Sequence, residues 1–190
     1  MPADVKAPWI SKREGGKQEL KMDEFRLYKV EPEYIKHLHK VDNRVSKKYC
    51  TRPFVGIVTM PNGTRYFLPL TSQTTKMRLA EGKKKRALSL TTFIRDSSGN
   101  EIASILHNNM IPVIDGAYTM MDITAEKDVY ESNEIRFIRK KHDQIIRKAK
   151  NVYEKRISGE DPFYNALCCD YEKLEKVSLK FKKRPTSRSL

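Results

Sequence analysis

The sequence predicts a single α+β domain in which a strand and a helix precede a block of antiparallel strands and two helices. Short segments that alternate apolar and polar residues, separated by turn residues, fill the first two thirds of the chain. A hydrophobic period of three to four residues dominates after Thr124. A chain of 190 residues is long enough for one domain and hardly long enough for two.

The first elements follow from local pattern. Residues Phe25 to Val30 alternate apolar and polar side chains, which predicts a strand. Pro32 is tolerated in the first turn of a helix, and from Tyr34 to Val45 apolar residues recur on one helical face. Asp42-Asn43 begins the exit from this helix.

A hairpin is predicted next. Phe54 to Met60 and Arg65 to Leu70 are rich in apolar residues, and Pro61-Asn62-Gly63 between them is a strong turn signal. The polar residues Thr71 to Lys76 leave the far end of the hairpin as a loop. Gly82 to Arg86 is predicted to be a basic loop.

Further strands follow. Leu88 to Arg95 and Ile102 to Leu106 predict two strands joined by a turn at Asp96 to Asn100. Met110 to Ile114 contains a proline, which favours an edge strand or a bulge. Tyr118 to Ile123 predicts the next extended segment.

The C-terminal part is helical by its period. Apolar residues from Ile135 to Val152 predict a long amphipathic helix whose other face is rich in Arg and Lys. His142 lies on the apolar stripe and is predicted to be a core residue. Gly159 and Pro162 end this helix, and Phe163 to Val177 predicts a second one.

The two ends differ from the middle in composition. Residues 1–24 are predicted to be a flexible N-terminal extension, 25–180 the folded domain, and 181–190 a basic disordered tail. The N-terminus is charged throughout, unlike a signal peptide, and no stretch approaches the roughly 20 apolar residues of a membrane span. Cysteine occurs three times without the spacing of a disulfide framework or a zinc site, so reduced thiols in a cytoplasmic protein are expected.

Charge gives the first indication of function. The chain has 38 Lys+Arg against 24 Asp+Glu, a formal net charge of +14. Basic proteins collect polyanions, because each neutralised phosphate releases counterions. Nucleic acid is therefore the favoured partner class, ahead of an anionic membrane surface or an unremarkable solvated surface.

Motifs for metal or nucleotide chemistry are absent from the sequence. It has no H-E-x-x-H, no cysteines paired at the spacing of a zinc site and no glycine-rich phosphate loop. Asp96, Asp115 and Asp122 are scattered, whereas a two-metal nuclease needs converging carboxylates. We expect no metal and no cofactor.

RNA can be cleaved without a metal because it carries its own nucleophile, the 2′-OH. The protein must accept one proton, donate another and stabilise charge on the phosphate. Thr71, Ser72, Thr74 and Thr75 supply hydroxyls and Lys76 an ammonium directly after a strand, and such groups can hold phosphate oxygens. By itself this segment is more typical of an ordinary polar loop.

Five segments, in order, resemble the ToxN/AbiQ family of endoribonuclease toxins from type III toxin–antitoxin systems. They cover about Phe25 to Lys180 and read F-R-L-Y-K-V-E-P-E-Y-I-K-H-L (25–38), R-P-F-V-G-I-V (52–58), Y-F-L-P-L-T-S (66–72), N-N-M-I-P-V-I (108–114) and I-R-F-I-R-K (135–140). The resemblance implies a compact, twisted antiparallel sheet or barrel like that of the Kid/MazF toxins.

The resemblance also implies site residues. Thr71 and Ser72 match the pair that contacts the scissile phosphate, Arg52 and Tyr34 match positions that face it, and Lys76 matches a following lysine. The family usually places Pro and Lys directly after the Ser, whereas here Gln73-Thr74-Thr75 comes first, so the lysine is displaced. Lys76 would be a general base if its surroundings favour the neutral amine, and otherwise it would stabilise the dianionic phosphorane, as Arg52 could. Tyr34 could instead pack in the core.

Several side chains are predicted to hold RNA by its phosphates or bases. They are Lys83, Lys84, Lys85, Arg86, Arg136, Arg139, Lys140 and Asn109. His107, beside Asn109, is a competing catalytic group, since a histidine suits acid–base chemistry near neutral pH. Loss of cleavage on His107→Ala would shift the assignment toward it.

The partners implied by the resemblance are RNAs. A small repetitive pseudoknot RNA would be cut from its precursor, would inhibit the toxin and would join it in a ring-like hetero-oligomer. The substrates would be cellular and phage RNA, and the result abortive infection. The alternatives are a non-catalytic RNA-binding protein and, more distantly, a basic structural or ribosome-associated protein.

Overall fold

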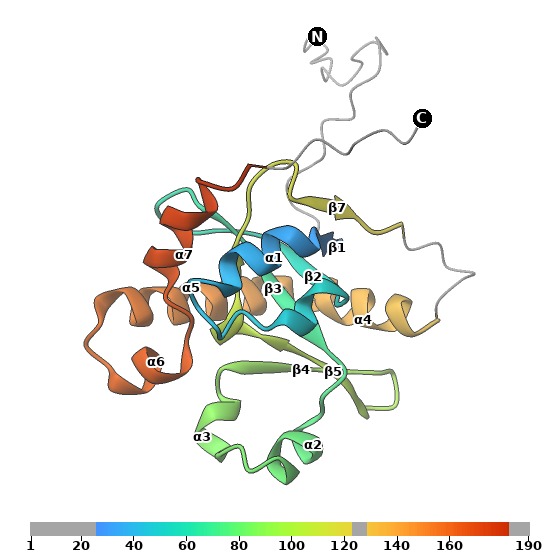
Figure 1. The fold of residues 1–190 in the computed structure, drawn as a ribbon. Coiled ribbons are helices and arrows are strands. Elements are labelled where there is room, and N and C mark those ends of the chain that lie inside the picture. The colour runs from blue at the N-terminus through green and yellow to red at the C-terminus, as the bar shows by residue number, and fades with distance from the viewer. Residues whose placement is uncertain (1–25, 123–128, 183–190) are drawn as a thin grey trace, which may run out of the picture.

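The computed structural model describes residues 26–122 and 129–182, which form a seven-stranded antiparallel sheet with helices packed around it (Figure 1). The strands are β1 (Arg26–Val30), β2 (Phe54–Thr59), β3 (Arg65–Thr71), β4 (Thr91–Arg95), β5 (Glu101–Leu106), β6 (Ile111–Pro112) and β7 (Tyr118–Met120). Their order is β4-β5-β3-β2-β1-β7, and β6 also pairs with β3. The predicted α+β class is confirmed.

The central strand β3 connects two parts of the sheet. One of its edges pairs with β2, while the other pairs first with β6, at Tyr66 and Phe67, and then with β5, at Leu70 and Thr71. Pro69, which has no N–H to donate, lies between these two partners. The last residue of the strand, Thr71, is therefore held in place by its pairing with β5.

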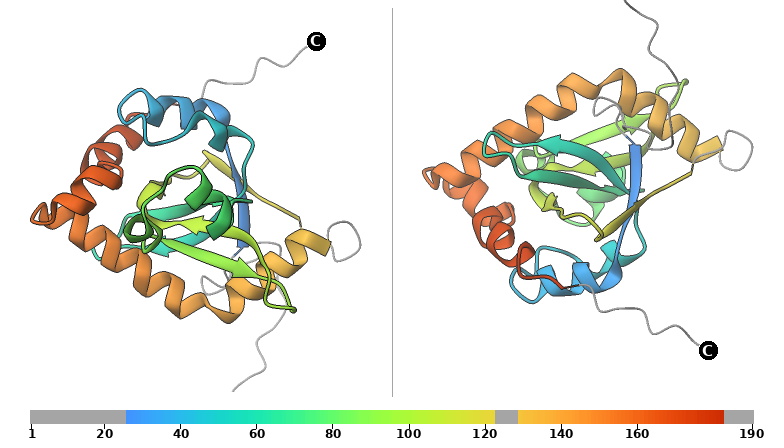
Figure 2. Two further views of the ribbon diagram at one scale, coloured as in Figure 1. Left: turned by 90° about the horizontal axis from the view of Figure 1, so that it is seen from below. Right: turned by 90° about the horizontal axis from the view of Figure 1, so that it is seen from above.

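Helices enclose this sheet. They are α1 (Pro32–His39), α2 (Thr75–Ala80), α3 (Lys85–Leu88), α4 (Val129–Lys140), α5 (His142–Ser158), α6 (Pro162–Leu167) and α7 (Tyr171–Ser178), with 3-10 turns η1 (Lys47–Cys50) and η2 (His107–Asn109). Figure 2 shows α1, α7, α5 and α4 following one another around the sheet, while α2 and α3 project from one side of it. The sheet and the enclosing helices share one core.

Large aromatic side chains dominate this core. Tyr34, Tyr66, Tyr171, Phe54 and Phe67 are among the largest side chains that are fully buried. Each such ring buries a large apolar area, and a buried tyrosine needs a partner for its hydroxyl. Tyr66 meets this need by donating to the Glu175 carboxylate at 2.7 Å. The helix α7, which carries Glu175, is thereby fixed to the centre of the sheet.

Two predicted loops contain helices. The polar segment Thr71 to Lys76 is extended only at its start, because α2 begins at Thr75, and the basic segment Gly82 to Arg86 leads into α3 at Lys85. Thr74 caps α2 by accepting a hydrogen bond from the Met77 N–H at 3.4 Å. This capping threonine is a local signal in the sequence for the start of a helix, and the prediction of a polar loop overlooked it.

Both predicted C-terminal helices are divided in two. The long helix breaks at Lys141, so that α4 packs against β4 while α5 packs against α6 and α7. The second helix breaks after Leu167, where the Cys169 N–H donates to the Asn108 carbonyl at 2.9 Å and Asp170 caps α7. Tertiary contacts outweigh the continuous helical period in both places.

His142 is not a core residue. It is the first residue of α5, its side chain is 30% exposed, and Nδ1 lies 2.9 Å from the Asp143 carboxylate. The break at Lys141 turns this position out of the buried stripe that the uninterrupted helix would have given it. The core prediction for His142 was wrong.

The predicted extension, residues 1–24, and most of the predicted tail, residues 183–190, lie outside the described residues. Within the part of the chain that the structure describes, no helix has the length and apolar character needed to cross a bilayer.

Candidate functional site

The end of β3 places a hydroxyl and a guanidinium together. Thr71 is paired with Ser104 of β5, and its side chain is buried, with 3% of the residue exposed. The Arg52 Nη1 donates to the Thr71 Oγ1 at 2.8 Å. Because Arg52 lies two residues before the first residue of β2, the adjacent strands β2 and β3 hold this pair in a defined position.

The residues after Thr71 serve different purposes. Ser72 is exposed just beyond the strand, so its hydroxyl is accessible to a ligand. Thr74 caps α2, and Thr75 donates both its N–H and its hydroxyl to the Glu101 carboxylate, at 2.8 and 3.0 Å. Two of the four predicted hydroxyls are therefore engaged in local structure.

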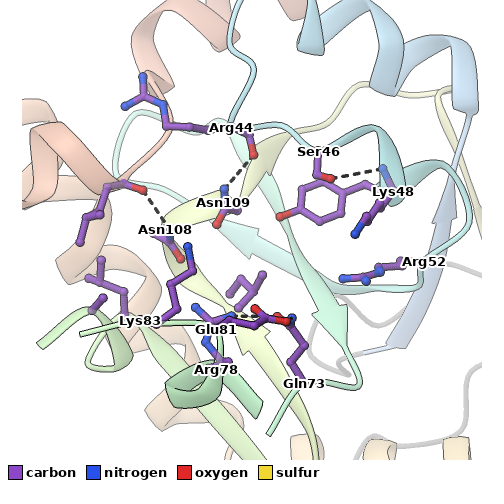
Figure 3. A pocket seen from close by; sticks show the side chains of 15 residues that line it. Arg44, Ser46, Lys48, Arg52, Gln73, Arg78, Glu81, Lys83, Asn108 and Asn109 are labelled. Atoms are coloured by element: carbon purple, nitrogen blue, oxygen red, sulfur yellow. Dashed lines mark hydrogen bonds between the residues drawn. The ribbon is translucent and has the colours of Figure 1, made fainter. Parts of the chain in front are cut away.

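Arg52, which donates to Thr71, lines a cavity of about 310 Å³ (Figure 3). Its wall comes from the segment after α1, from α2 and α3, and from the ends of β5 and α6. The lining residues are Arg44, Ser46, Lys48, Tyr49, Arg52, Gln73, Arg78, Glu81, Lys83, Ala87, Leu90, Leu106, Asn108, Asn109 and Leu167. This volume is at the low end of the range of small-molecule sites, about 300 to 1,000 Å³.

Positive charge dominates the cavity wall. Five of the lining residues just named are Arg or Lys, and the one acidic lining residue is Glu81. Arg44 is neutralised outside the cavity, because its Nε lies 2.9 Å from the buried Asp42 carboxylate. The remaining cations give the cavity a field that favours an anion.

Arg78 differs from the other cations in the cavity because it is buried without an ion pair in the described chain. Only 8% of this residue is exposed, and burial lowers the pKa of its guanidinium. Its Nη1 donates to the Gln73 Oε1 at 3.3 Å, whereas Nε has no hydrogen-bond partner. Within residues 26–122 and 129–182 it forms no ion pair.

Tyr49 adds a hydroxyl that is available to a ligand. The residue is buried and lines the cavity, and within the described chain no group hydrogen-bonds its hydroxyl. Burial raises the pKa of Tyr49, and the nearby charges of Arg52 and Arg78 oppose that rise. The hydroxyl stays protonated and can donate to an anionic ligand.

Two amides supply acceptors. The Asn108 Nδ2 donates to the Leu167 carbonyl at 3.0 Å, and the Asn109 Nδ2 to the Arg44 carbonyl at 2.8 Å. Because each amide nitrogen is engaged by a carbonyl, the side-chain oxygen is left to accept a hydrogen bond from a ligand.

The predicted catalytic residues do not all converge. Thr71, Arg52 and the exposed Ser72 lie together, but Lys76 is exposed on α2 and is not among the residues that line the cavity. Tyr34 is fully buried in the core, and its hydroxyl donates to the Pro112 carbonyl at 2.7 Å. Of the five predicted catalytic residues, Arg52 lines the cavity, whereas Thr71, Ser72, Lys76 and Tyr34 are not among its lining residues.

The competing histidine is inside the protein. His107 is fully buried, and its Nε2 lies 2.9 Å from the Thr92 Oγ1. Burial, with a smaller contribution from the charge of Lys148, lowers the pKa of His107 to about 3. This histidine lines no part of the cavity, so it is not placed for acid–base chemistry there.

The predicted RNA-binding residues fall into two groups. Lys83 and Asn109 line the cavity, next to Lys84 and Lys85, which are exposed at the start of α3. The Arg86 guanidinium lies 4.3 Å from the centre of the Phe163 ring, so it ties α3 to α6. The second group is exposed on α4 and comprises Arg136, Arg139 and Lys140.

The lining residues that sequence reasoning missed include Arg78, Tyr49 and Lys48. Each follows a local element that was not recognised: α2 carries Arg78, and η1 carries the other two. The capping signal at Thr74 could have revealed α2. No pattern within the sequence indicated that Arg78 would be buried without an anion.

Acidic and sulfur ligands do not gather anywhere in the described part of the chain. Among residues 26–122 and 129–182, no group of three or more His, Cys, Asp or Glu side chains is arranged to hold a metal ion.

An antiparallel sheet whose central strand ends beside a cation-lined cavity defines a protein suited to holding a polyanion. The family model of the toxin ToxN, from type III toxin–antitoxin systems, matches residues 26–178, and the chain belongs to this family. It is 28% identical over 180 residues to the endoribonuclease ToxN of Bacillus thuringiensis subsp. kurstaki, a match that covers 87% of this chain and 89% of the relative.

Two solved structures are similar. One is a toxin of a bacterial type III system that is selectively inhibited by a non-coding RNA pseudoknot; it has a TM-score of 0.73 at 28% identity, covering 85% of this chain and 100% of that chain. The other is AbiQ, a lactococcal anti-phage endoribonuclease of a type III system, with a TM-score of 0.73 at 26% identity, covering 85% and 99%.

Proposed function

We propose that this protein is an endoribonuclease toxin that cleaves RNA through attack of a 2′-OH on the adjacent phosphate. The products would be a 2′,3′-cyclic phosphate and a 5′-OH. The observation that carries the proposal is the Arg52–Thr71 pair, at 2.8 Å, beside a cation-lined cavity. Membership of the ToxN family supports it, as does the similarity to two proteins named as endoribonucleases.

The proposed roles follow from the contacts. Arg52 stays charged and offers a planar set of donors, so it stabilises the negative charge that grows on the phosphorane. Thr71, which accepts from Arg52, orients that guanidinium and directs its own hydroxyl hydrogen to a phosphate oxygen. The exposed Ser72 hydroxyl donates to the same phosphate. The catalytic roles of Lys76 and Tyr34 stay predictions that rest on the resemblance, because neither residue lines the cavity.

The decisive experiment is cleavage in the presence of EDTA, with analysis of the RNA ends. We expect cleavage to persist and to leave cyclic phosphate and 5′-OH ends. A matched RNA with 2′-deoxy residues at the cut sites should stay intact, because it lacks the nucleophile. RNA that is bound but never cut would favour the non-catalytic alternative, and cutting that needs magnesium would overturn the mechanism.

We further propose that a small pseudoknot RNA, cut by this toxin from a repetitive precursor, inhibits it and assembles with it in a ring-like complex. The similar toxin that an RNA pseudoknot inhibits and the similar anti-phage endoribonuclease support this system-level role. The described free thiols of Cys50, Cys168 and Cys169 suit the reducing cytoplasm, where phage and cellular RNA are translated.

Induction in cells tests this role. Expression of the toxin should arrest growth, and co-expression of a short tandem-repeat RNA encoded upstream should restore it. Growth arrest that no upstream RNA relieves would contradict the assignment of an RNA inhibitor while leaving the cleavage chemistry intact.

A further inference from the structure

The proposed cleavage site leaves one buried charge in the cavity unused. Arg78 is 8% exposed, forms no ion pair within the described chain, and has an Nε with no hydrogen-bond partner. A buried charge without a counter-ion is costly, and proteins normally pair it. We therefore expect a bound ligand to supply the negative charge that pairs with Arg78.

The charge of the neighbouring carboxylate, Glu81, acts on Arg78, but the two side chains form no ion pair. Glu81 lines the same cavity, but its Oε1 accepts from the Gln73 Nε2 at 2.7 Å. The other end of the same amide, Oε1, accepts from the Arg78 Nη1 at 3.3 Å. A neutral amide is thus inserted between the acid and the guanidinium, which holds Arg78 in place without an ion pair.

Arg78 and Arg52 line the same cavity. The charges of both guanidiniums oppose the rise that burial causes in the pKa of Tyr49, so both lie near this third lining residue. A cavity of about 310 Å³ accommodates a single nucleotide unit and is too small for a folded RNA. Two cations in a cavity of this size fit two successive phosphates of one extended strand.

We infer that Arg78, positioned by Gln73, binds a phosphate next to the scissile one in a single-stranded RNA substrate. This inference rests on the proposed function for the scissile position, at Arg52 and Thr71. It also accounts for the three residues that stand after Ser72 where the family usually has Pro and Lys. Gln73 positions Arg78, Thr74 caps the helix that carries Arg78, and Thr75 attaches that helix to Glu101.

The first test measures binding with no cleavage. The probe is a fully 2′-O-methylated oligonucleotide of mixed sequence, which keeps every phosphate and has no nucleophile. Arg78→Gln should weaken binding about tenfold or more, as expected for a lost charged hydrogen bond. The slope of log affinity against log salt should fall by about 0.7, the value for one phosphate on a single strand.

Matched variants separate this role from a structural one. Arg65→Gln removes a guanidinium that pairs with Asp115 at 2.8 Å outside the cavity, and it should change affinity less than twofold. Gln73→Ala should weaken binding while keeping the salt slope, because the charge remains but its orientation is lost. Arg78→Gln should keep or raise the Tm, since it removes a desolvated charge. A lowered Tm together with unchanged affinity and slope would overturn the inference.

The second test locates the phosphate. Single methylphosphonate linkages, which are neutral, are placed at and around a mapped cleavage site in the uncleavable oligonucleotide. The neighbouring linkage should weaken binding to the wild type and have no effect on Arg78→Gln. The inference would be overturned if the effect of Arg78→Gln coupled to the scissile linkage or to no linkage. It would also be overturned if Arg78→Gln weakened the binding of inorganic phosphate and left the binding of the oligonucleotide unchanged. If the first test succeeds while RNA is never cut, the proposed function fails and the phosphate-binding role of Arg78 stands.

Discussion

At the scale of single residues, the hydroxyl of Thr71 contacts Arg52, whereas the hydroxyls of Thr74 and Thr75 contact other parts of the structure. Its position is set by the pairing of β3 with β5, and its partner is fixed by the start of β2. Thr74, only three positions further along, has the same side chain but caps a helix. Chemically identical groups in one short segment therefore have separable roles.

The first prediction compares these two threonines. Thr71→Val, which keeps the shape and removes the hydroxyl, should lower the cleavage rate about 10- to 100-fold by releasing Arg52 and removing a phosphate contact. Thr74→Val should lower the free energy of unfolding by about 0.5–2 kcal/mol through loss of a helix cap, and leave the cleavage rate of the folded protein nearly unchanged. Single-turnover cleavage and urea unfolding measure the two effects. Equal cleavage losses in both variants would contradict the separate roles.

The second prediction concerns His107 and the pH dependence of stability. An unfolded histidine takes up a proton near pH 6.5, whereas folded His107 stays neutral down to a pKa of about 3. The unfolded state thus binds the proton first, and stability is lost as pH falls below about 6.5. The loss should approach about 1.4 kcal/mol per pH unit from this group until about pH 3.

Urea unfolding at a series of pH values between about 4 and 7 measures this slope. His107→Gln should show a shallower slope than the wild type, because its side chain takes up no proton in either state. Identical slopes would mean that His107 is protonated in the folded protein, and would return it to the list of catalytic candidates.

At the scale of elements, the contact between β2 and β3 depends on a glycine. A Cβ built at Gly56 would lie 2.3 Å from the Phe67 ring, far inside van der Waals contact. Phe67 is fully buried and stacks on Tyr28 with ring centres 4.5 Å apart, so the ring has little freedom to move away. The glycine lets these two strands, which carry Arg52 and Thr71 at their ends, pack beneath an aromatic cluster.

The third prediction follows from this contact. Gly56→Ala should lower the free energy of unfolding by about 1–3 kcal/mol, the usual cost of inserting a methyl group into a filled core. Gly63→Ala serves as the comparison, because a Cβ at Gly63 meets nothing within 4 Å and the cost there is backbone strain from φ +83° alone. Gly56→Ala with Phe67→Leu should regain part of the loss, whereas Gly63→Ala with Phe67→Leu should not. Absence of any such difference would exclude the proposed clash.

At the scale of the whole molecule, the cations divide between a cavity and an outer helix. The cavity fits one strand of RNA, while the exposed face of α4, with Arg136, Arg139 and Lys140, is open to a larger folded RNA. A formal net charge of +14 attracts both, and the two surfaces give each a different place to bind.

The fourth prediction separates the two surfaces. Replacing Arg136, Arg139 and Lys140 together by Gln should weaken binding of the folded antitoxin RNA at least tenfold and reduce its salt dependence. Cleavage of a short single-stranded RNA should be nearly unaffected. Arg52→Gln should show the reverse, with cleavage abolished and antitoxin binding largely kept. Filter binding and oligonucleotide cleavage measure both; parallel losses in the two variants would mean one continuous RNA site.

The sequence by itself determined the order and type of most elements, since strand alternation, turn residues and helical period are local properties of the chain. It also determined the family, through short ordered segments such as residues 66–72, and with it the pair Thr71 and Ser72. The same resemblance suggested Arg52 as a site residue; its guanidinium donates to Thr71, and the catalytic roles of both residues stay predictions. These successes share a cause, which is that each depends on neighbouring residues or on a short motif.

Only the tertiary structure decided which side chains meet in the cavity. Lys76 and Arg78 lie two positions apart on α2, yet one is exposed and the other is buried beside Gln73, because burial depends on which face of that helix packs against the protein. Likewise, Tyr34 is buried and its hydroxyl donates to the Pro112 carbonyl, whereas Tyr49 lines the cavity. Long-range packing sets these differences, and no local pattern in the sequence contains them.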